Sequence, residues 1–370
     1  MAKRLVIVQS YIPSYRVDFF ERLHDRLLER GIQCVIAAGA PEGEQAERGD
    51  AAAPEWLTPI KRNMLVIRGR SINTSVQPKP WMDADGVIFG LKGTSLPVYE
   101  ALMYRRSKGT RIGLWGHVRP YVNSGNWLDL RFERFQMQQA DHVFAYTGGG
   151  AEFAMQAGIN PDKVTEVGNT INSELLREEL NGISTKDVIK FAQERNFDPS
   201  RAVGYIGGLD ASKRIAFLAK SLNYLWDLDP TIHLLVAGSG AHVGLLQEAQ
   251  YRGQVSFLGF SDVRQKALVI KSSRALCLPG RIGLVAVDAL TGQIPILTTE
   301  WPFHAPEFEY LVEGHSKVTA SNTPEAYARL IMSYVTGTEP RGSSSADWPV
   351  PNLENMVKNF SAGVVKMLAP

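Results

Sequence analysis

A histidine, a lysine and an aspartate each follow a short apolar run, at positions where a polar side chain can meet a ligand. His117 lies in the segment LWGHV, Lys213 in GYIGGLDASKR and Asp288 in PGRIGLVAVDALTG. An imidazole can exchange a proton with a hydroxyl group, an ammonium group can bind phosphate, and a carboxylate can accept hydrogen bonds from sugar hydroxyls. The structural alternatives are a packed histidine, a solvated lysine and a surface aspartate.

Glycine-rich turns accompany the lysine and the aspartate. GYIGGLDASKR (204–214) and PGRIGL (279–284) each connect an apolar run to a helical pattern, and Ser212 is a candidate N-cap. Backbone N–H groups at such turns favour an anion, so both are candidates for diphosphate binding. A third turn, VAGSGAHVGLL (236–246), lacks the glycine spacing of a dinucleotide fingerprint, and close packing is the favoured interpretation there.

The first half of the chain offers three further candidates. Tyr15 and Arg16 lie just beyond the apolar run LVIVQ, and Trp115 lies two residues before His117. The helix dipole disfavours an arginine at a helix start, which suggests an anionic partner for Arg16. An exposed arginine without such a partner is the alternative.

The elements that must position these residues alternate along the chain. Continuous apolar runs, typical of strands buried on both faces, are separated by segments of helix length. The runs of the first half are LVIVQ (5–9), CVIAA (34–38), MLVIR (64–68), GVIFGL (86–91), RIGLWG (111–116) and HVFAYT (142–147). After a charged helical stretch at about 173–195, the series resumes with AVGYIGG, HLLVAG, VSFLGF, RALCLP and IPILTT. The pattern predicts an α/β protein with two doubly wound Rossmann-like domains.

We predict an N-terminal domain over residues 1–175 and a C-terminal domain over residues 195–345. The Gly/Ser/Pro-rich stretch 336–352 is expected to be a loop, and a last amphipathic helix at about 352–370 is expected to pack back on the first domain. Ligands of open α/β sheets bind beyond the carboxyl ends of the strands, so the two domains would face a common cleft. Each domain would then hold one of two substrates.

Composition and charge restrict the class of protein. The 370 residues are 44% hydrophobic and 21% charged, with a net charge of +2, which fits a folded globular protein and gives no case for nucleic acid. Cys34 and Cys277 lie in apolar runs, which predicts buried thiols in a reducing compartment. No apolar stretch has the length of a membrane span. We expect a cytoplasmic protein, with any membrane contact peripheral and on the inner face.

Taken together, these segments resemble glycosyltransferase family 4, whose members have the two-domain GT-B fold. GGLDASKR resembles the family segment G-R-L-D-x-x-K-G, and PGRIGLVAVDALTGQIPIL resembles the signature P-x-x-E-G-F-G-L-x-x-x-E-A-x-A-x-G-x-P-V. HLLVAGSG and VSFLGF resemble strands of the nucleotide-binding domain. The chain also resembles a divergent bacterial subgroup of this family, in the segments YIPSYRVDFF, LWGHV, ADHVFAYTGGGAEF, VGNTIN and HAPEFEYLVEG.

The resemblance implies a retaining, metal-independent hexosyltransferase without a cofactor. It would move a sugar from a nucleoside diphosphate sugar to a glycan or lipid-linked acceptor in surface polysaccharide biosynthesis. His117 would act at the transferred sugar, while the first-domain positions of Tyr15, Arg16 and Trp115 place them with the acceptor. The donor-binding candidates are Gly208, Lys213, Phe260, Arg281, Gly283, Leu284 and Asp288.

Departures from the family pattern keep other functions open. The family's arginine is Gly208, the first glutamate of the signature is Gly280, and the second is shortened to Asp288. One alternative is a degenerate family member that binds a nucleotide sugar without transferring it. A GT-B sugar-nucleotide epimerase is the second alternative. The third is a transferase acting on modified nucleic acid, which the near-neutral charge disfavours.

Overall fold

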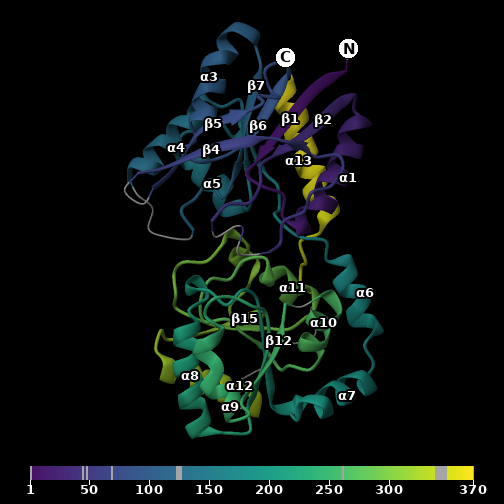
Figure 1. The fold of residues 1–370 in the computed structure, drawn as a ribbon, viewed down its shortest axis with the longest axis vertical. Coiled ribbons are helices and arrows are strands. Elements are labelled where there is room, and N and C mark those ends of the chain that lie inside the picture. Colours follow the sequence, from purple (N-terminus) through teal and green to yellow (C-terminus); the bar gives the residue numbers. More distant parts are fainter. Residues whose placement is uncertain are drawn as a thin grey trace. The chain divides into compact units, whose positions relative to one another are not determined.

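The computed structural model describes residues 2–43, 46, 49–67, 70–121, 127–260, 262–337 and 348–369. The chain forms two compact units, drawn in Figure 1. The first unit combines residues 1–171 with residues 351–370, and the second consists of residues 172–350. The charged helical stretch at about 173–195, which falls mostly between the two predicted domains, therefore belongs to the second unit.

The first unit is built on a seven-stranded sheet with the order β3-β2-β1-β6-β7-β8-β9, in which every neighbouring pair is parallel. Its strands are β1 (Lys3–Gln9), β2 (Ile32–Ala38), β3 (Thr58–Pro59), β6 (Gly86–Gly90), β7 (Arg111–Gly116), β8 (His142–Ala145) and β9 (Val164–Glu166). The continuous apolar runs form these strands because both faces of the sheet are covered by helices. The doubly wound α/β prediction is confirmed here.

One predicted strand was assigned wrongly. Residues 64–67 of the run MLVIR (64–68) lie in β4 (Lys61–Ile67), which pairs antiparallel with β5 (Arg70–Gln77) in a separate two-stranded sheet; Arg68 lies outside the described residues. Leu65 and Val66 are exposed rather than buried between helices. A run of five apolar-looking residues cannot distinguish a central strand from a hairpin, because the two have the same local pattern.

The helices of the first unit are α1 (Val17–Leu28), α3 (Leu96–Lys108), α4 (Trp127–Gln139), α5 (Gly148–Gln156) and α13 (Leu353–Leu368). Figure 1 shows α13 beside α1, and the contacts between elements agree. Phe360 of α13 is fully buried and packs on Phe19, Trp115 and Phe144, with ring centroids 4.6–5.5 Å apart. The helix at the end of the chain therefore completes the core of the first unit.

Two strands carry glycine where α13 crosses them. A Cβ atom on Gly86 would lie 2.6 Å from Leu368, and one on Gly113 would lie 2.8 Å from the Met367 sulfur. A larger residue at either position would force the Leu368 or Met367 side chain to move. These glycines explain how residues more than 250 positions apart in the sequence pack at van der Waals distance.

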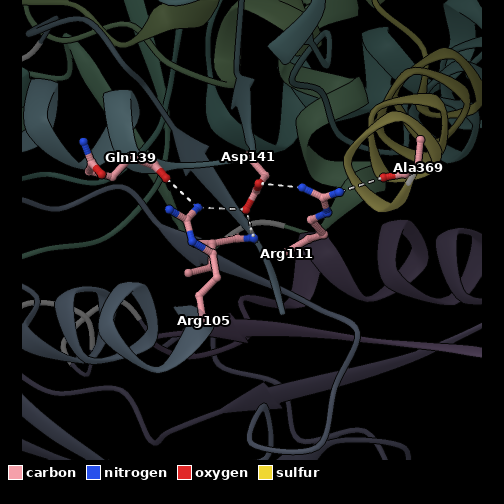
Figure 2. A network of polar contacts seen from close by, with 6 residues as sticks. Arg105, Arg111, Gln139, Asp141 and Ala369 are labelled. Carbon is pink, nitrogen blue, oxygen red and sulfur yellow. Dashed lines mark hydrogen bonds and ion pairs between the residues drawn. The ribbon is translucent and has the colours of Figure 1, made fainter. Parts of the chain in front are cut away.

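A polar network fastens the amino-terminal ends of β7 and β8, as Figure 2 shows. The Asp141 carboxylate accepts from Arg105 at 3.1 Å, from Arg111 at 3.2 Å and from the amide of Ile112 at 2.8 Å. Arg105 also donates to the Gln139 carbonyl, and Arg111 donates to the Ala369 carbonyl just after α13. A single carboxylate thus links α3, the sheet and the end of the chain.

The second unit has a six-stranded parallel sheet with the order β12-β11-β10-β13-β14-β15. Its strands are β10 (Ala202–Ile206), β11 (His233–Ala237), β12 (Val255–Gly259), β13 (Leu276–Cys277), β14 (Ile296–Thr299) and β15 (Lys317–Ala320). Its helices are α6 (Glu174–Gly182), α7 (Thr185–Arg195), α8 (Ile215–Leu228), α9 (Gln247–Tyr251), α10 (Val263–Lys271), α11 (Val285–Thr291) and α12 (Pro324–Thr336). This unit is also doubly wound, as predicted.

Several remaining expectations have definite outcomes. Cys34 and Cys277 are free, buried thiols, and burial raises the pKa of each to about 12. Among the described residues, no helix is long and apolar enough to cross a membrane. Most of the predicted loop at 336–352 lies outside the described residues, because 338–347 are not among them.

Candidate functional site

The turn after β10 is capped by an aspartate and not by the predicted serine. The Asp210 carboxylate accepts from the amides of Ser212 at 2.7 Å and Lys213 at 3.3 Å, and from the Ser212 hydroxyl at 2.6 Å. A short 3-10 turn covers Ala211–Lys213, and α8 begins only at Ile215. The amides of Ser212 and Lys213 are therefore occupied within the turn. Diphosphate binding here stays a prediction, which rests on the Lys213 charge.

The same turn is joined to the segment 279–284 by two hydrogen bonds. The Lys213 ammonium donates to the Arg281 carbonyl at 2.6 Å, and the Arg281 amide donates to the Ser212 carbonyl at 2.9 Å. Gly280 allows this approach, because a Cβ atom there would lie 2.4–2.8 Å from backbone atoms of Lys213. The position where the family signature has its first glutamate has no room for a side chain.

A second pair of turns interlocks next to the first. A Cβ atom on Gly238 would lie only 1.8 Å from the Gly207 carbonyl oxygen. The Leu209 amide donates to the Ser239 carbonyl, and the His242 amide donates to the Leu209 carbonyl, both at 2.9 Å. The close-packing interpretation of VAGSG is thus confirmed. The turns after β11, β10 and β13 form one continuous backbone layer at the carboxyl edge of the sheet.

The start of α11 holds the open donors of this layer. Within the described residues, the amides of Gly283, Leu284 and Val285 have no hydrogen-bond acceptor, as expected for the first turn of a helix. The Arg281 Nε is buried and likewise has no acceptor among those residues. Three amides and a guanidinium therefore remain able to receive an anion beside the Lys213 charge.

A buried histidine supports this turn, and a buried glutamate lies near it. The Ile282 amide donates to Nδ1 of His304 at 3.2 Å, and the imidazole stacks on Phe308 with ring centroids 3.8 Å apart. Burial lowers the pKa of His304 to about 4, so its ring is neutral and can accept that bond near pH 7. The Glu307 carboxylate is buried and lies 3.7 Å from the place a Cβ atom would take on Gly283.

Asp288 lies on α11 with its carboxylate almost fully buried. The Lys266 ammonium of α10 is 3.4 Å away and forms an ion pair with it. No sequence pattern predicted Lys266 as a partner, because the two residues lie 22 positions apart on different helices. Phe260, at the end of β12, is 74% exposed and precedes α10.

Arg214 occupies the position of the final glycine in the family segment and has a left-handed backbone, with φ of 57°. Its guanidinium donates to the Pro279 carbonyl and to the Thr299 hydroxyl, both at 3.0 Å. It also lies over the rings of Phe217 at 4.0 Å and Trp301 at 4.5 Å. These contacts hold a conformation that costs a non-glycine residue on the order of 1–2 kcal/mol.

In the first unit, His117 lies just after β7 and is partly exposed. Its ring packs on Tyr146 with centroids 5.1 Å apart, and its carbonyl lies 2.7 Å from the place a Cβ atom would take on Gly150. The next residue, Val118, has a φ of 68°, a genuine outlier for a β-branched side chain. Strain of this kind is concentrated at functional sites, which makes the His117 turn a candidate on geometric grounds.

Two acceptor-side predictions need correction. Arg16 is only 5% exposed, and its guanidinium donates to the Asn169 side chain and to the Thr170 carbonyl. Trp115 is buried in the aromatic core around Phe360. Both are packing residues, because partners far along the chain satisfy the arginine and surround the indole. Tyr15 alone of the three acceptor-side candidates is exposed.

No metal site emerges from the described residues, where no three histidine, cysteine or acidic side chains lie together. Two Asp-x-Asp sequences occur, at 83–85 and 227–229. Asp85 accepts from the Arg4 amide, and Asp229 is paired with Arg201. Each pair thus has one carboxylate engaged in holding the fold.

Comparison with known proteins agrees with this architecture. Residues 187–345 match the family model for Glycosyl transferases group 1. The match spans the second unit from α7 onward, so this unit contains a glycosyl transferases group 1 domain. No curated protein sequence matches the chain.

Solved structures match over nearly the whole chain. Alr3699/HepE of Anabaena in complex with UDP is 13% identical with a TM-score of 0.68, covering 98% of this chain and 99% of that one. The lipopolysaccharide outer core galactosyltransferase WaaB is 14% identical with a TM-score of 0.62, covering 98% and 99%. A glycosyltransferase from Rickettsia africae is 12% identical with a TM-score of 0.63, covering 99% and 96%. At these identities the likeness establishes the fold, which is GT-B.

Proposed function

We propose that this protein is a glycosyltransferase that takes its sugar from a nucleoside diphosphate sugar. The match of residues 187–345 to the group 1 family carries the proposal, because every donor-side candidate from Gly208 to Asp288 lies within it. The UDP complex of the Anabaena protein supports a nucleoside diphosphate as the leaving group. Membership of family 4, and of its bacterial subgroup, is part of the proposal.

The chemistry requires stabilisation of a departing diphosphate. Charge that develops on the leaving group is best met by fixed donors that need no rearrangement. The amides of residues 283–285, the Arg281 guanidinium and the Lys213 ammonium are such donors, and they lie on two turns joined by the bond from Lys213 to the Arg281 carbonyl. This set supports departure of the diphosphate without a resident metal or cofactor.

The roles that we propose for the other site residues are those that the family resemblance implies. We assign Asp288, paired with Lys266, to the ribose hydroxyls, and the main chain at Phe260 to the base. His117 would hydrogen-bond the transferred sugar or assist deprotonation of the acceptor hydroxyl. The proposed acceptor is a glycan or lipid-linked sugar of surface polysaccharide assembly, held by the first unit, with retention at the anomeric carbon. The proposed location is the cytoplasm.

The first experiment is a calorimetric titration with UDP, GDP and ADP. Replacement of Lys213 by Gln removes the charge but keeps a donor for the Arg281 carbonyl. A charge-assisted phosphate contact contributes on the order of 1.5–3 kcal/mol, so affinity should fall about ten- to a hundred-fold. Lys220→Gln, at an exposed lysine of α8, is the matched control. Equal affinity in both variants would remove Lys213 from the donor site.

Transfer is tested separately from binding. Incubation of a nucleotide sugar with and without acceptor distinguishes a transferase from an epimerase, since only an epimerase converts the donor alone. Because general acid–base assistance contributes about 10²–10⁴-fold, His117→Ala should lower turnover at least about 100-fold with little change in nucleotide affinity. Tight nucleotide binding with neither reaction would identify the degenerate binder that Gly280 keeps open.

A further inference from the structure

A buried carboxylate lies beside the turn that the proposed donor site uses. Glu307 is 3% exposed, and its Oε2 atom lies 3.7 Å from the place that a Cβ atom would take on Gly283. Standard bond lengths and angles put that place about 2.5 Å from the Gly283 nitrogen, so Oε2 lies at most about 6 Å from this amide. The roles proposed above for the donor residues leave this carboxylate unused.

The segment that follows β14 places Glu307 at the turn. The Ala305 amide donates to the Ile282 carbonyl at 2.8 Å, and the Ile282 amide donates to Nδ1 of His304 at 3.2 Å. The short 3-10 helix that contains Glu307 begins directly after these bonds and brings the carboxylate to Gly283. Hydrogen bonds on both sides of Ile282 therefore fix the position of this segment relative to the turn.

The surroundings of this segment are positive. The Lys317 ammonium lies over the ring of Phe308, the residue after Glu307, with Nζ 4.1 Å from the ring centroid. Burial is the main cause of the low pKa of His304, and the charges of Lys317 and Lys213 lower this pKa further. Both ammonium groups therefore act on this segment. Positive charges nearby favour the ionised form of a carboxylate, which keeps Glu307 anionic near neutral pH.

An ionised carboxylate interacts differently with a nucleotide sugar and with the product of its reaction. It only accepts hydrogen bonds, so a sugar hydroxyl can donate to it but an ionised phosphate cannot. In a nucleoside diphosphate sugar, the terminal phosphate is esterified and carries a single negative charge. In the free diphosphate, the charge of this phosphate approaches two once the pH is above about 6. A fixed anion a few ångström away therefore repels the product more strongly than the substrate.

We propose that Glu307 lets the donor site distinguish the nucleotide sugar from the free nucleoside diphosphate. Its carboxylate accepts a hydrogen bond from a hydroxyl of the donor sugar and repels the additional charge of the product. A site made only of cations and amides would favour the more highly charged product and release it slowly. Glu307 offsets that preference. This inference rests on the proposed function and adds to it a residue that determines specificity.

A purely structural role for Glu307 predicts a different result. If the carboxylate only supported the turn, its removal would disturb the position of Arg281 and of the neighbouring amides, and both ligands would bind less tightly. If the carboxylate acts on the ligands directly, the two affinities should change in opposite directions. The ratio of the two dissociation constants therefore separates the two roles.

Calorimetric titration of the full chain at pH 8 measures this ratio, with UDP, GDP and ADP each compared with its glucose ester. Glu307→Gln keeps the shape of the side chain but removes its charge. The free diphosphate should then bind about ten-fold more tightly, because the repulsion is lost. The ester should bind about three- to ten-fold less tightly, since a hydrogen bond to a neutral amide is about half as strong as one to a carboxylate. Glu307→Asp keeps the charge but shortens the reach, so it should weaken binding of the ester alone.

The matched control is Glu309→Gln, at an exposed carboxylate of the same 3-10 helix. It should bind both ligands like the wild type, and melting temperatures establish that each variant is folded. Wild-type affinity of Glu307→Gln for the free diphosphate would overturn the proposal. So would an equal loss of affinity for both ligands in either Glu307 variant, which would make the residue structural.

Two further outcomes have a defined meaning. If Glu307→Gln does not fold, Glu307→Asp decides alone, because it weakens the ester selectively only if the carboxylate contacts the sugar. A wild-type chain that binds neither the diphosphates nor their esters would contradict the proposed function itself. A chain that binds both, with the Glu307 variants equal to the Glu309 control, would contradict this inference and leave the proposed function standing.

Discussion

The turn that follows β7 in the first unit and the turn that follows β10 in the second are strained in the same way but held by different forces. Val118 and Arg214 both have left-handed backbones, and each comes directly after a candidate site residue. The other non-glycine residues of this kind in the described ranges, Asn196 and Gln293, lie at the ends of α7 and α11. Those two have the ordinary explanation of a helix end.

Val118 is held by burial, since its side chain belongs to the apolar core of the first unit. Arg214 is held by two hydrogen bonds and two aromatic rings, and its neighbour Lys213 is tied to Arg281. The polar turn fixes the Lys213 ammonium through other polar contacts. The apolar turn fixes His117 without adding charge. If the proposed function is right, the first arrangement suits the anionic diphosphate of the donor and the second suits a neutral hydroxyl of the acceptor.

The largest effect is expected at Gly280. Because a Cβ atom would lie 2.4–2.8 Å from the Lys213 backbone, Gly280→Ala should destabilise the second unit by about 3 kcal/mol, the upper end for overpacking. Gly280→Glu, which restores the family's first glutamate, should be worse. Urea unfolding gives the value. Gly244→Ala, at a glycine with no atom within 4 Å of its Cβ position, should change stability by less than about 1 kcal/mol. A similarly small loss of stability in the two alanine variants would show that the turn accommodates a side chain at position 280 at little cost.

Acid should loosen the support of the same turn. Burial holds the pKa of His304 at about 4, below its ordinary value, so between pH 6.5 and 4 the unfolded chain binds a proton that the folded chain does not. Stability therefore falls as pH decreases through this window, by about 2–3 kcal/mol at pH 4.5. His304→Asn keeps an acceptor for the Ile282 amide and should flatten this decline. Hydrogen exchange of peptides covering 279–284 reports the change.

The control for that prediction lies in the first unit. Burial also lowers the pKa of His142 to about 4, so exchange in β8 should remain acid-sensitive in the His304 variant. If His304→Asn leaves the exchange of 279–284 as acid-sensitive as before, His304 does not support the turn.

Two substitutions of Arg214 separate the cost of its left-handed backbone from the contribution of its side-chain contacts. Arg214→Ala loses both hydrogen bonds and both ring contacts while keeping a left-handed backbone, and should cost about 2–3 kcal/mol. Arg214→Gly loses the same contacts but relieves the strain, so it should be about 1 kcal/mol more stable than the alanine variant. Chemical denaturation of both proteins measures this difference. An alanine variant as stable as the glycine variant would mean that the backbone relaxes once the anchor is gone.

A smaller effect is expected at Val118. Val118→Ala should cost about 2 kcal/mol from lost burial, and Val118→Gly should cost less because it removes the strain. The usual order, in which glycine is worse than alanine, would be reversed. Turnover should fall more in the glycine variant, since glycine at position 118 leaves the φ and ψ angles beside His117 less restricted. The comparison fails if the glycine variant is less stable than the alanine variant, or if its turnover is no lower.

Local pattern predicted most of the sheets because strands covered on both faces must be apolar throughout. LVIVQ and AVGYIGG became β1 and β10 for this reason. MLVIR has the same composition, but it forms an exposed hairpin strand whose partner, β5, lacked the pattern. A short apolar run indicates a tendency to form a strand. It does not indicate which sheet the strand joins.

The site was harder to predict because its decisive contacts are long-range. The partner of Arg16 is Asn169, and the partner of Asp288 is Lys266 on another helix. From the family pattern, Gly280 is interpreted as a missing carboxylate. In the structure, its lack of a side chain lets the backbone of Lys213 approach. Ser212 and Asp210 are both good caps two residues apart, and only the geometry of the turn distinguishes them. Ligand roles inferred from the family pattern remain predictions for the experiments above.

The path of the chain between the units has a consequence for its synthesis. The first unit is interrupted after residue 171 and is resumed only at residue 351. At about 5–20 residues per second, a ribosome needs roughly 10–40 s to make the intervening segment. Throughout that interval the sheet that will receive Phe360 stays uncovered. By the end of it, all strands of the second unit have been made. The later-made half should therefore be the first to fold, and the earlier-made half should be the one that a nascent-chain chaperone protects.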